Sequence, residues 1–175
     1  AVDDQLHMSN CDDMRKQFEK DVSTNFDVEL MGQAHWCLQA RITQHANFDM
    51  TLDQSRYAAL ICNRFTPSPP IDTATPEDCE TYKRPLPDGF IATKEDQAKD
   101  MFEVKRLADE FGFKCSSVVG MLIFSMNTFI YLHFGIRKLA KFNTRPGRKH
   151  CEAAAHFLRH LRCNTRCGGL RYCAN

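Results

Sequence analysis

The sequence predicts an α+β fold, with β-hairpins in the first third of the chain and helices in the rest. Apolar and polar residues alternate between positions 36 and 52, as in strands that bury one face. Six of the seven prolines fall between Pro67 and Pro87, which divides the chain into two parts. After position 93 the apolar residues recur at helical spacing, so the second part is expected to be helical.

A first hairpin is expected over residues 1–9, with Asp3 and Asp4 in its turn. A helix capped by Asn10 or Asp12 should follow. Its apolar stripe would pack on the back of the hairpin and comprises Met14, Phe18, Val22 and Phe26.

The clearest strand spans residues 36–43, with Trp36, Leu38, Ala40 and Ile42 on one buried face. A turn at residues 45–47 leads to a second alternating run, Phe48, Met50 and Leu52. Thr51 and Gln54 form a capping-box pattern that would open a helix reaching Arg64. The residues expected to be buried on that helix are Tyr57, Leu60, Ile61 and Phe65.

Residues 66–92 read as a proline-rich linker without regular structure. A helix is expected from Thr93 to Phe111, with Gly112 as its C-cap and with Met101, Val104, Ala108 and Phe111 on one face. The apolar stretch 118–134 is long enough to be weighed as a membrane span, but its polar residues favour a pair of core helices. The last helix should run from Arg148 to Cys163, with an apolar stripe of Cys151, Ala154, Ala155, Leu158 and Leu161.

The formal net charge of +1 hides a strong asymmetry. Residues 1–134 carry 13 Lys and Arg against 21 Asp and Glu, whereas residues 135–175 carry 10 against the single Glu152. A basic block of this density indicates a polyanionic partner, nucleic acid before membrane; the alternative is a solvated basic face.

Nine cysteines are spread along the chain, several of them at apolar helix or strand positions. Free cysteine behaves there as a small hydrophobe, and disulfide scaffolds belong mostly to smaller secreted chains. No signal peptide is visible. We therefore expect reduced thiols and an intracellular protein, in the cytoplasm or the nucleus.

Several short motifs occur in an order and at a spacing typical of one family. They are Val2-Asp3-Asp4, Gln54-Ser55-Arg56-Tyr57, Arg64-Phe65, Ser117-Val118-Val119-Gly120-Met121-Leu122, Pro146-Gly147-x-x-His150-x-Glu152-Ala153-Ala154, Leu158-Arg159-x-Leu161 and Gly169-Leu170-Arg171-Tyr172. The set resembles the reverse transcriptase of copia-type LTR retrotransposons, from the catalytic Asp-Asp turn to the connection. It covers most of the chain and is sparsest across residues 66–112.

Two positions depart from the family's pattern. Ala1 stands where the family has Tyr or Phe before Val-Asp-Asp, and Phe129-Ile130-Tyr131 stand where it has Arg-Pro-Asp. The second change removes a proline and with it the helix–turn–helix signal. Because the chain begins at Ala1 without a methionine, we expect it to be a piece of a longer polyprotein.

The resemblance implies a fold in which residues 1–65 are the C-terminal part of a polymerase palm and 66–92 a linker. Residues 93–167 would be a helical thumb and 168–175 the start of the connection or RNase H region. It also implies a Mg²⁺-dependent RNA-directed DNA polymerase in which Asp3 and Asp4 are catalytic metal ligands. In the family the third carboxylate and the fingers precede this segment, so we expect the chain alone to be inactive.

The partners implied are an RNA or DNA template–primer and the remainder of the polyprotein, with no membrane. The basic C-terminal helices fit a thumb that grips the nucleic-acid backbone. The candidates for phosphate contacts are Arg145, Arg148, Lys149, Arg159 and Arg162.

Two other classes of function compete with this interpretation. The first is a small zinc-binding, nucleic-acid-binding module, since His-x₃-His followed by Cys-x₃-Cys has ligand-compatible spacing. Its ligands would come from His156, His160, Cys163, Cys167 and Cys173. The second is a secreted or membrane-anchored interaction protein that uses the nine cysteines or the stretch 118–134.

Overall fold

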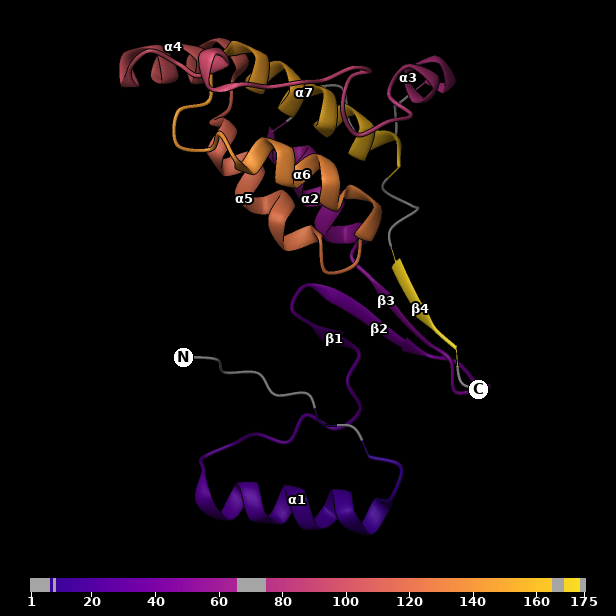
Figure 1. The fold of residues 1–175 in the computed structure, drawn as a ribbon. Coiled ribbons are helices and arrows are strands. Elements are labelled where there is room, and N and C mark those ends of the chain that lie inside the picture. The colour runs from indigo at the N-terminus through magenta and orange to yellow at the C-terminus, as the bar shows by residue number, and fades with distance from the viewer. Residues whose placement is uncertain (1–6, 8, 66–74, 165–168, 174–175) are drawn as a thin grey trace.

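The computed structural model describes residues 7, 9–65, 75–164 and 169–173 and has an α+β fold (Figure 1). Its helices are α1 (Asp12–Asn25), α2 (Ser55–Phe65), α3 (Pro76–Thr81), α4 (Met101–Phe111), α5 (Cys115–Ser125), α6 (His133–Ala140) and α7 (Arg148–Cys163). The strands are β1 (Trp36–Cys37), β2 (Ala40–Gln44), β3 (Met50–Asp53) and β4 (Gly169–Tyr172). Two 3₁₀ turns, η2 (Lys94–Asp96) and η3 (Ile130–Leu132), precede α4 and α6.

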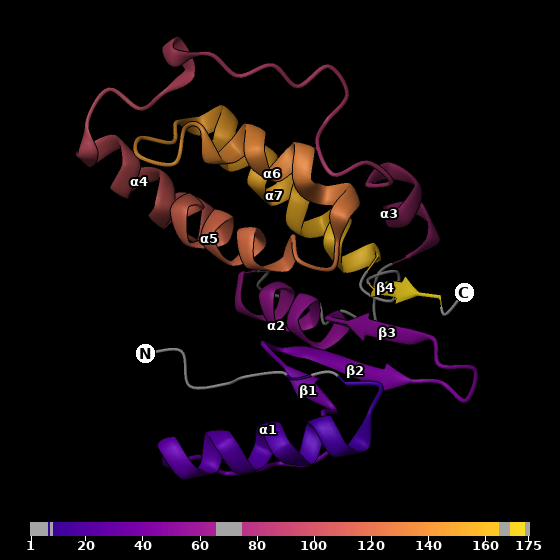
Figure 2. The same cartoon turned by 60° about the horizontal axis from the view of Figure 1, so that its bottom comes forward.

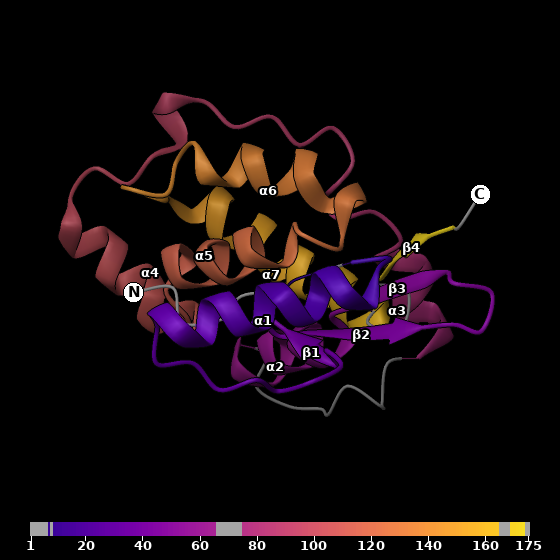
Figure 3. The ribbon, with the colours of Figure 1, turned by 90° about the horizontal axis from the view of Figure 1, so that it is seen from below.

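The strands form one antiparallel sheet in the order β1-β2-β3-β4. Helix α2 lies between this sheet and the helices α4 to α7, and α1 lies on the far side of the sheet (Figures 2 and 3). The last strand returns from the end of α7 to pair with β3, Leu170 opposite Leu52. The sheet therefore combines three strands from the first third of the chain with one strand near its C-terminal end.

The prediction of a single strand over residues 36–43 is wrong, because a two-residue turn divides this segment into β1 and β2. Trp36 pairs with Arg41 and Cys37 with Ala40, which leaves Leu38 and Gln39 at the turn with φ of 47° and 62°. This is the twist of a type I′ hairpin, which favours Asn-Gly and costs other residues roughly 1–2 kcal/mol each. Trp36 consequently lies on the opposite face from Ala40, 48% exposed rather than in the core.

The second hairpin turn is confirmed between β2 and β3, where the His45 amide donates to the Asp49 carbonyl. The capping box is wrong: Thr51 lies inside β3 and its hydroxyl bonds to His45. Asp53 instead accepts from the amide of Ser55 at the first turn of α2. On α2 the buried residues include Ile61 and Phe65 as expected, while Leu60 is 48% exposed.

Helix α1 confirms the predicted helix but buries none of its residues among the described part of the chain. Cys11, not Asn10 or Asp12, is its N-cap and makes no side-chain cap. Met14 and Phe26 are more than two-thirds exposed. The first hairpin and Val2-Asp3-Asp4 lie outside the described residues.

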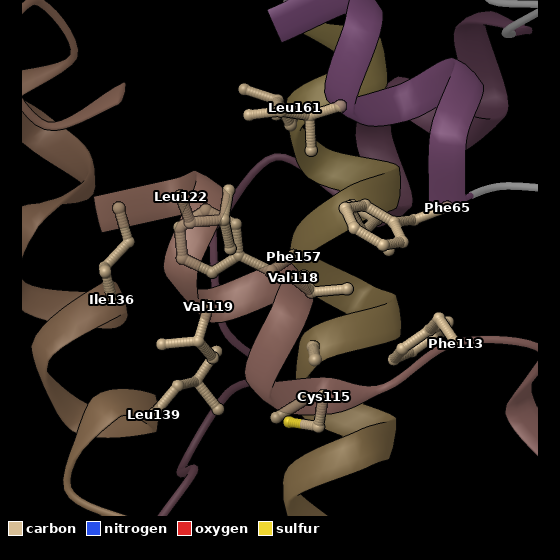
Figure 4. Close-up of a cluster of buried hydrophobic side chains, with 14 of the residues drawn as sticks. Phe65, Phe113, Cys115, Val118, Val119, Leu122, Ile136, Leu139, Phe157 and Leu161 are labelled. Carbon is tan, nitrogen blue, oxygen red and sulfur yellow. The ribbon is translucent and has the colours of Figure 1, made fainter. Parts of the chain in front are cut away.

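The main core joins α2 to the later helices. Val118, Val119 and Leu122 of α5 meet Ile136 and Leu139 of α6 and Phe157 of α7 (Figure 4). Phe65 of α2 packs into the same cluster, and its ring stands edge-on to that of Phe113. Burying about ten large apolar side chains in one contiguous cluster is what fixes α2 to α5 and α7.

The helical part follows the prediction with three differences. Residues 66–92 contain a helix, α3, whose capping box between Thr75 and Asp78 offsets the helix-breaking composition. The expected helix 93–111 is split into η2 and α4, which ends at Gly112 with φ 74° as predicted. Its buried residue is Leu107, while Met101 is 63% exposed.

The stretch 118–134 is interrupted at residues 126–129 although no proline is present. It holds most of α5, the 3₁₀ turn η3 and only the first two residues of α6, rather than the expected pair of core helices. Among the described residues, no helix combines the length and apolarity that crossing a bilayer requires. Helix α7 has the predicted bounds and the predicted stripe, widened by Ala153 and Phe157.

Candidate functional site

The predicted magnesium ligands Asp3 and Asp4 lie outside the described residues. Within the described ranges, no three His, Cys, Asp or Glu side chains come together as a metal site. Residues that follow Asp4 in the sequence line a hollow of about 640 Å³. They are His7, Ser9, Asn10, Met14 and Phe18. These described lining residues carry no carboxylate, so their side chains offer a hard cation only the neutral oxygens of Ser9 and Asn10.

The start of α7 is the most tightly built part of the basic region. The backbone of Gly147 passes so close to η2 that a Cβ atom there would lie 2.1 Å from the Asp96 carbonyl oxygen. The Gly147 amide donates to Nδ1 of the fully buried His150, 3.1 Å away. Burial lowers the pKa of His150, and the amide donor also requires a neutral ring at Nδ1. The His150 side chain therefore satisfies the backbone amide of Gly147 at the N-terminus of α7.

Arg148 and Lys149 project from this first turn toward acidic residues. Arg148 binds both carboxylate oxygens of Glu110 at 2.7 Å, and Lys149 lies 3.3 Å from Asp96. The Arg148 guanidinium holds the pKa of Glu110 below its usual value. Both pairs reach the surface, so solvent screens them and each can give way to a competing anion.

Arg159 and Arg162 lie near the other end of α7. The guanidinium of Arg159 is 5.4 Å from the ring centroid of Tyr82 and donates to its hydroxyl at 3.0 Å. Arg162 is half-buried, and its charge helps to lower the pKa of Asp78 after the main effect of the Thr75 backbone amide. Arg145 is exposed in the loop before α7, where its carbonyl accepts from the Ala98 amide.

The five predicted cations thus follow α7 from end to end rather than gathering at one point. Arg148, Lys149 and Arg159 contact residues of α4, of η2 and of the C-cap of α3, three segments that pack against α7. Such a row has the shape of a backbone-tracking surface for a polyanion. Its contacts carry no base-reading geometry, so binding through it would be independent of sequence.

The alternative zinc site is not assembled by its described members. His156 Nε2 bonds to the Arg84 carbonyl at 3.0 Å and His160 Nδ1 to the Tyr82 carbonyl at 2.7 Å. Cys173 is exposed on the strand side, and Cys167 lies outside the described residues. The two histidines fasten the segment after α3 to α7 instead.

The eight cysteines in the described ranges are free thiols. Burial raises the pKa of Cys62 to about 12, so its thiol stays protonated inside the core. Cys62, Cys115 and Cys151 are buried, which agrees with the expectation that several cysteines serve as small hydrophobic residues.

One charged contact of the sheet was not predicted from the sequence. Arg171 of β4 donates to the carboxylate of Asp49 at 2.7 and 3.0 Å, and the Asp49 side chain is 6% exposed. Nothing in the spacing of these residues, 122 positions apart, signals their contact. The pair fixes β4 to the hairpin turn between β2 and β3.

Comparison with protein-family models, curated proteins and solved structures gives no match to this chain.

Proposed function

We propose that this chain is a segment of a reverse transcriptase of the copia-type retrotransposon family and that it binds a nucleic-acid primer–template. What carries the proposal is the C-terminal motif series, which coincides with distinct structural features. Pro146-Gly147 is the tight entry to α7, the Glu152-to-Leu161 blocks lie on that helix, and Gly169-Leu170-Arg171-Tyr172 is β4.

The proposed division of labour follows the resemblance. Helices α1 and α2 and strands β1 to β3 would be the end of the palm. The helices from α4 to α7 would be the thumb, and β4 the start of the connection. The row of cations along α7 supports a thumb that contacts phosphates. Nucleotidyl transfer is proposed only for the complete enzyme, in which Mg²⁺ at Asp3 and Asp4 would activate the primer hydroxyl and stabilise the leaving pyrophosphate.

Fluorescence anisotropy with a labelled RNA–DNA primer–template tests the proposal. Binding by the 175-residue chain is expected to weaken steeply between low and high salt, because each phosphate contact releases counterions. The double variant Arg145→Gln/Arg159→Gln should lower the salt slope by about 2, roughly one per lost contact.

Helix α1 provides the matched control, because it also exposes two neighbouring cations. Arg15→Gln/Lys16→Gln removes the same charge far from α7 and should leave the slope unchanged (Figure 1). Equal effects of the two double variants would mean non-specific attraction and would reject α7 as the contact surface. Absence of binding at low salt would reject nucleic-acid binding by this chain.

A further inference from the structure

We infer that Gln54 and Thr128 form a latch through which the helices hold the exposed β1–β2 turn in its left-handed conformation. Gln54 precedes α2, and Thr128 lies in the break between α5 and η3. The turn, Leu38-Gln39, is the part of the sheet that the latch reaches. The inference concerns the chain's own residues and stands independently of the proposed function.

The latch consists of two hydrogen bonds that meet in one side-chain amide. Gln54 Nε2 donates to the Leu38 carbonyl at 3.3 Å, and the Thr128 hydroxyl donates to Gln54 Oε1 at 2.8 Å. A carbonyl can only accept, so Nε2 must face Leu38 and Oε1 must face Thr128. The amide therefore has one orientation that satisfies both ends.

The side chains of Gln54 and Thr128 are both buried, which raises the cost of losing either hydrogen bond. Gln54 is 1% and Thr128 4% exposed, so water cannot replace a partner that is lost. Few polar side chains are this buried in the described part of the chain, and this pair joins the sheet to the helical core across 74 positions.

The Thr128 end of the latch is firmly held. The amides of Thr128 and Phe129 both donate to the Ser125 carbonyl, at 3.2 and 3.0 Å, and Phe129 is fully buried. The His133 ring bonds to the Met126 carbonyl at 2.8 Å, which closes the same loop from the other side. The break between α5 and η3 is thus a rigid anchor.

The Leu38 end of the latch has a backbone conformation that requires stabilisation. Leu38 and Gln39 both have positive φ without being glycine or asparagine, and both are exposed. Their own side chains contribute no burial that would compensate for the conformation. A hydrogen bond to the Leu38 carbonyl from a fixed donor supplies that compensation, and the donor is fixed by Thr128.

Hydrogen exchange at single amides tests the latch. The Ile42 amide donates to the His35 carbonyl at 2.8 Å across the β1–β2 hairpin, and the His45 amide donates to Asp49 at the far turn. Thr128→Val is expected to speed exchange at Ile42 by about tenfold and to leave His45 unchanged, since one hydrogen bond of local stability is lost. Acrylamide quenching of Trp36, the single tryptophan, should rise with it.

Two variants on the same loop serve as controls. Ser125→Ala removes a fully buried hydroxyl that bonds only within its own helix, to the Leu122 carbonyl, and should not affect Ile42. Thr128→Ser keeps the donor and should restore slow exchange. Gln54→Met, which removes the amide at similar length, should match Thr128→Val, and the double variant should add nothing further.

The inference is overturned if Thr128→Val leaves Ile42 exchange unchanged, or if Ser125→Ala raises it equally. It is also overturned if Gln54→Met and Thr128→Val act additively, because the two residues would then not belong to one latch. Since none of these measurements uses nucleic acid, their outcome is separate from that of the binding test.

Discussion

Gly147 owes its identity to the space around it rather than to its backbone angles. Its φ of −90° is accessible to any residue, but the Asp96 carbonyl leaves no room for a side chain. The glycine thus allows η2 and the start of α7 to touch through their backbones. A side chain as small as the methyl group of alanine at this position would therefore push η2 and the start of α7 apart.

We expect Gly147→Ala to lower the free energy of unfolding by about 1–3 kcal/mol, because the added carbon overpacks a site closed by backbone. Urea unfolding monitored by circular dichroism measures the change. Gly120→Ala is the matched control, since a Cβ there meets nothing within 4 Å in the middle of α5. That control should stabilise by about 0.5–1 kcal/mol, and an equal loss in both variants would contradict the packing argument.

Residue roles were predictable where one local rule decides them. Gly112 follows an apolar helical stripe and caps α4 with positive φ, as expected. Trp36 and Gln54 were not, because their places depend on a turn at Leu38-Gln39 that has none of the usual turn residues. The alternation of apolar and polar residues continues through the turn, so the sequence gives no sign that the strand is interrupted there.

Strand β4 is attached to the sheet along β3 alone. It is short and mostly exposed, so little apolar burial holds it. The ion pair between Arg171 and the nearly buried Asp49 adds a charge-assisted contact at the end of the strand. At the scale of elements, this pair adds a side-chain contact to the backbone pairing of β4 with β3.

Replacing Arg171 by Ala is expected to loosen β4, since the nearly buried Asp49 carboxylate loses this cation. Faster amide exchange at Met50 to Asp53 and at β4, with unchanged exchange in α7, would be the signature. Arg41→Ala, an exposed arginine on β2, controls for loss of a surface charge. If both variants act alike, the Asp49 contact is not what anchors β4.

Element prediction worked best where periodicity is long. The sixteen residues of α7 carry a clear stripe, and its approximate bounds were predicted correctly. Helix α3 was missed, because its proline falls at the first helical turn, where proline is tolerated, and its cap outweighs the composition. The break after α5 also has no proline or glycine to signal it.

The whole molecule carries two buried histidines on α7, His150 and His160, whose pKa values burial lowers. In the unfolded chain both titrate near pH 6.5. As the pH falls below that value the unfolded state takes up protons that the folded state refuses, so stability decreases. The loss continues until the pH reaches the lowered folded values.

We therefore expect the free energy of unfolding to fall between pH 7 and 5, by up to about 1.4 kcal/mol per pH unit for each histidine. Denaturant titrations at several pH values measure the slope. His150→Gln keeps an acceptor for the Gly147 amide but cannot be protonated, and should flatten the curve. A flat curve in the original chain would contradict the argument.

The fold class was predictable from the sequence, because alternation and helical periodicity occupy different parts of the chain. The arrangement of those parts was not. That α2 belongs to the same core as α5 and α7 follows from side-chain complementarity over a long separation, which periodicity does not encode. The same holds for the cations: their positions on α7 were predicted, but not their contacts with Glu110, Asp96 and Tyr82.

The late arrival of β4 has a consequence during synthesis. More than a hundred residues separate β3 from β4, so at about 5–20 residues per second the ribosome exposes the β3 edge for roughly 5–20 s before its partner emerges. An unpaired strand edge is a site for wrong partners, including another nascent chain. Slow translation of the helical region should therefore promote aggregation, and chaperones that shield strand edges should matter most in that interval.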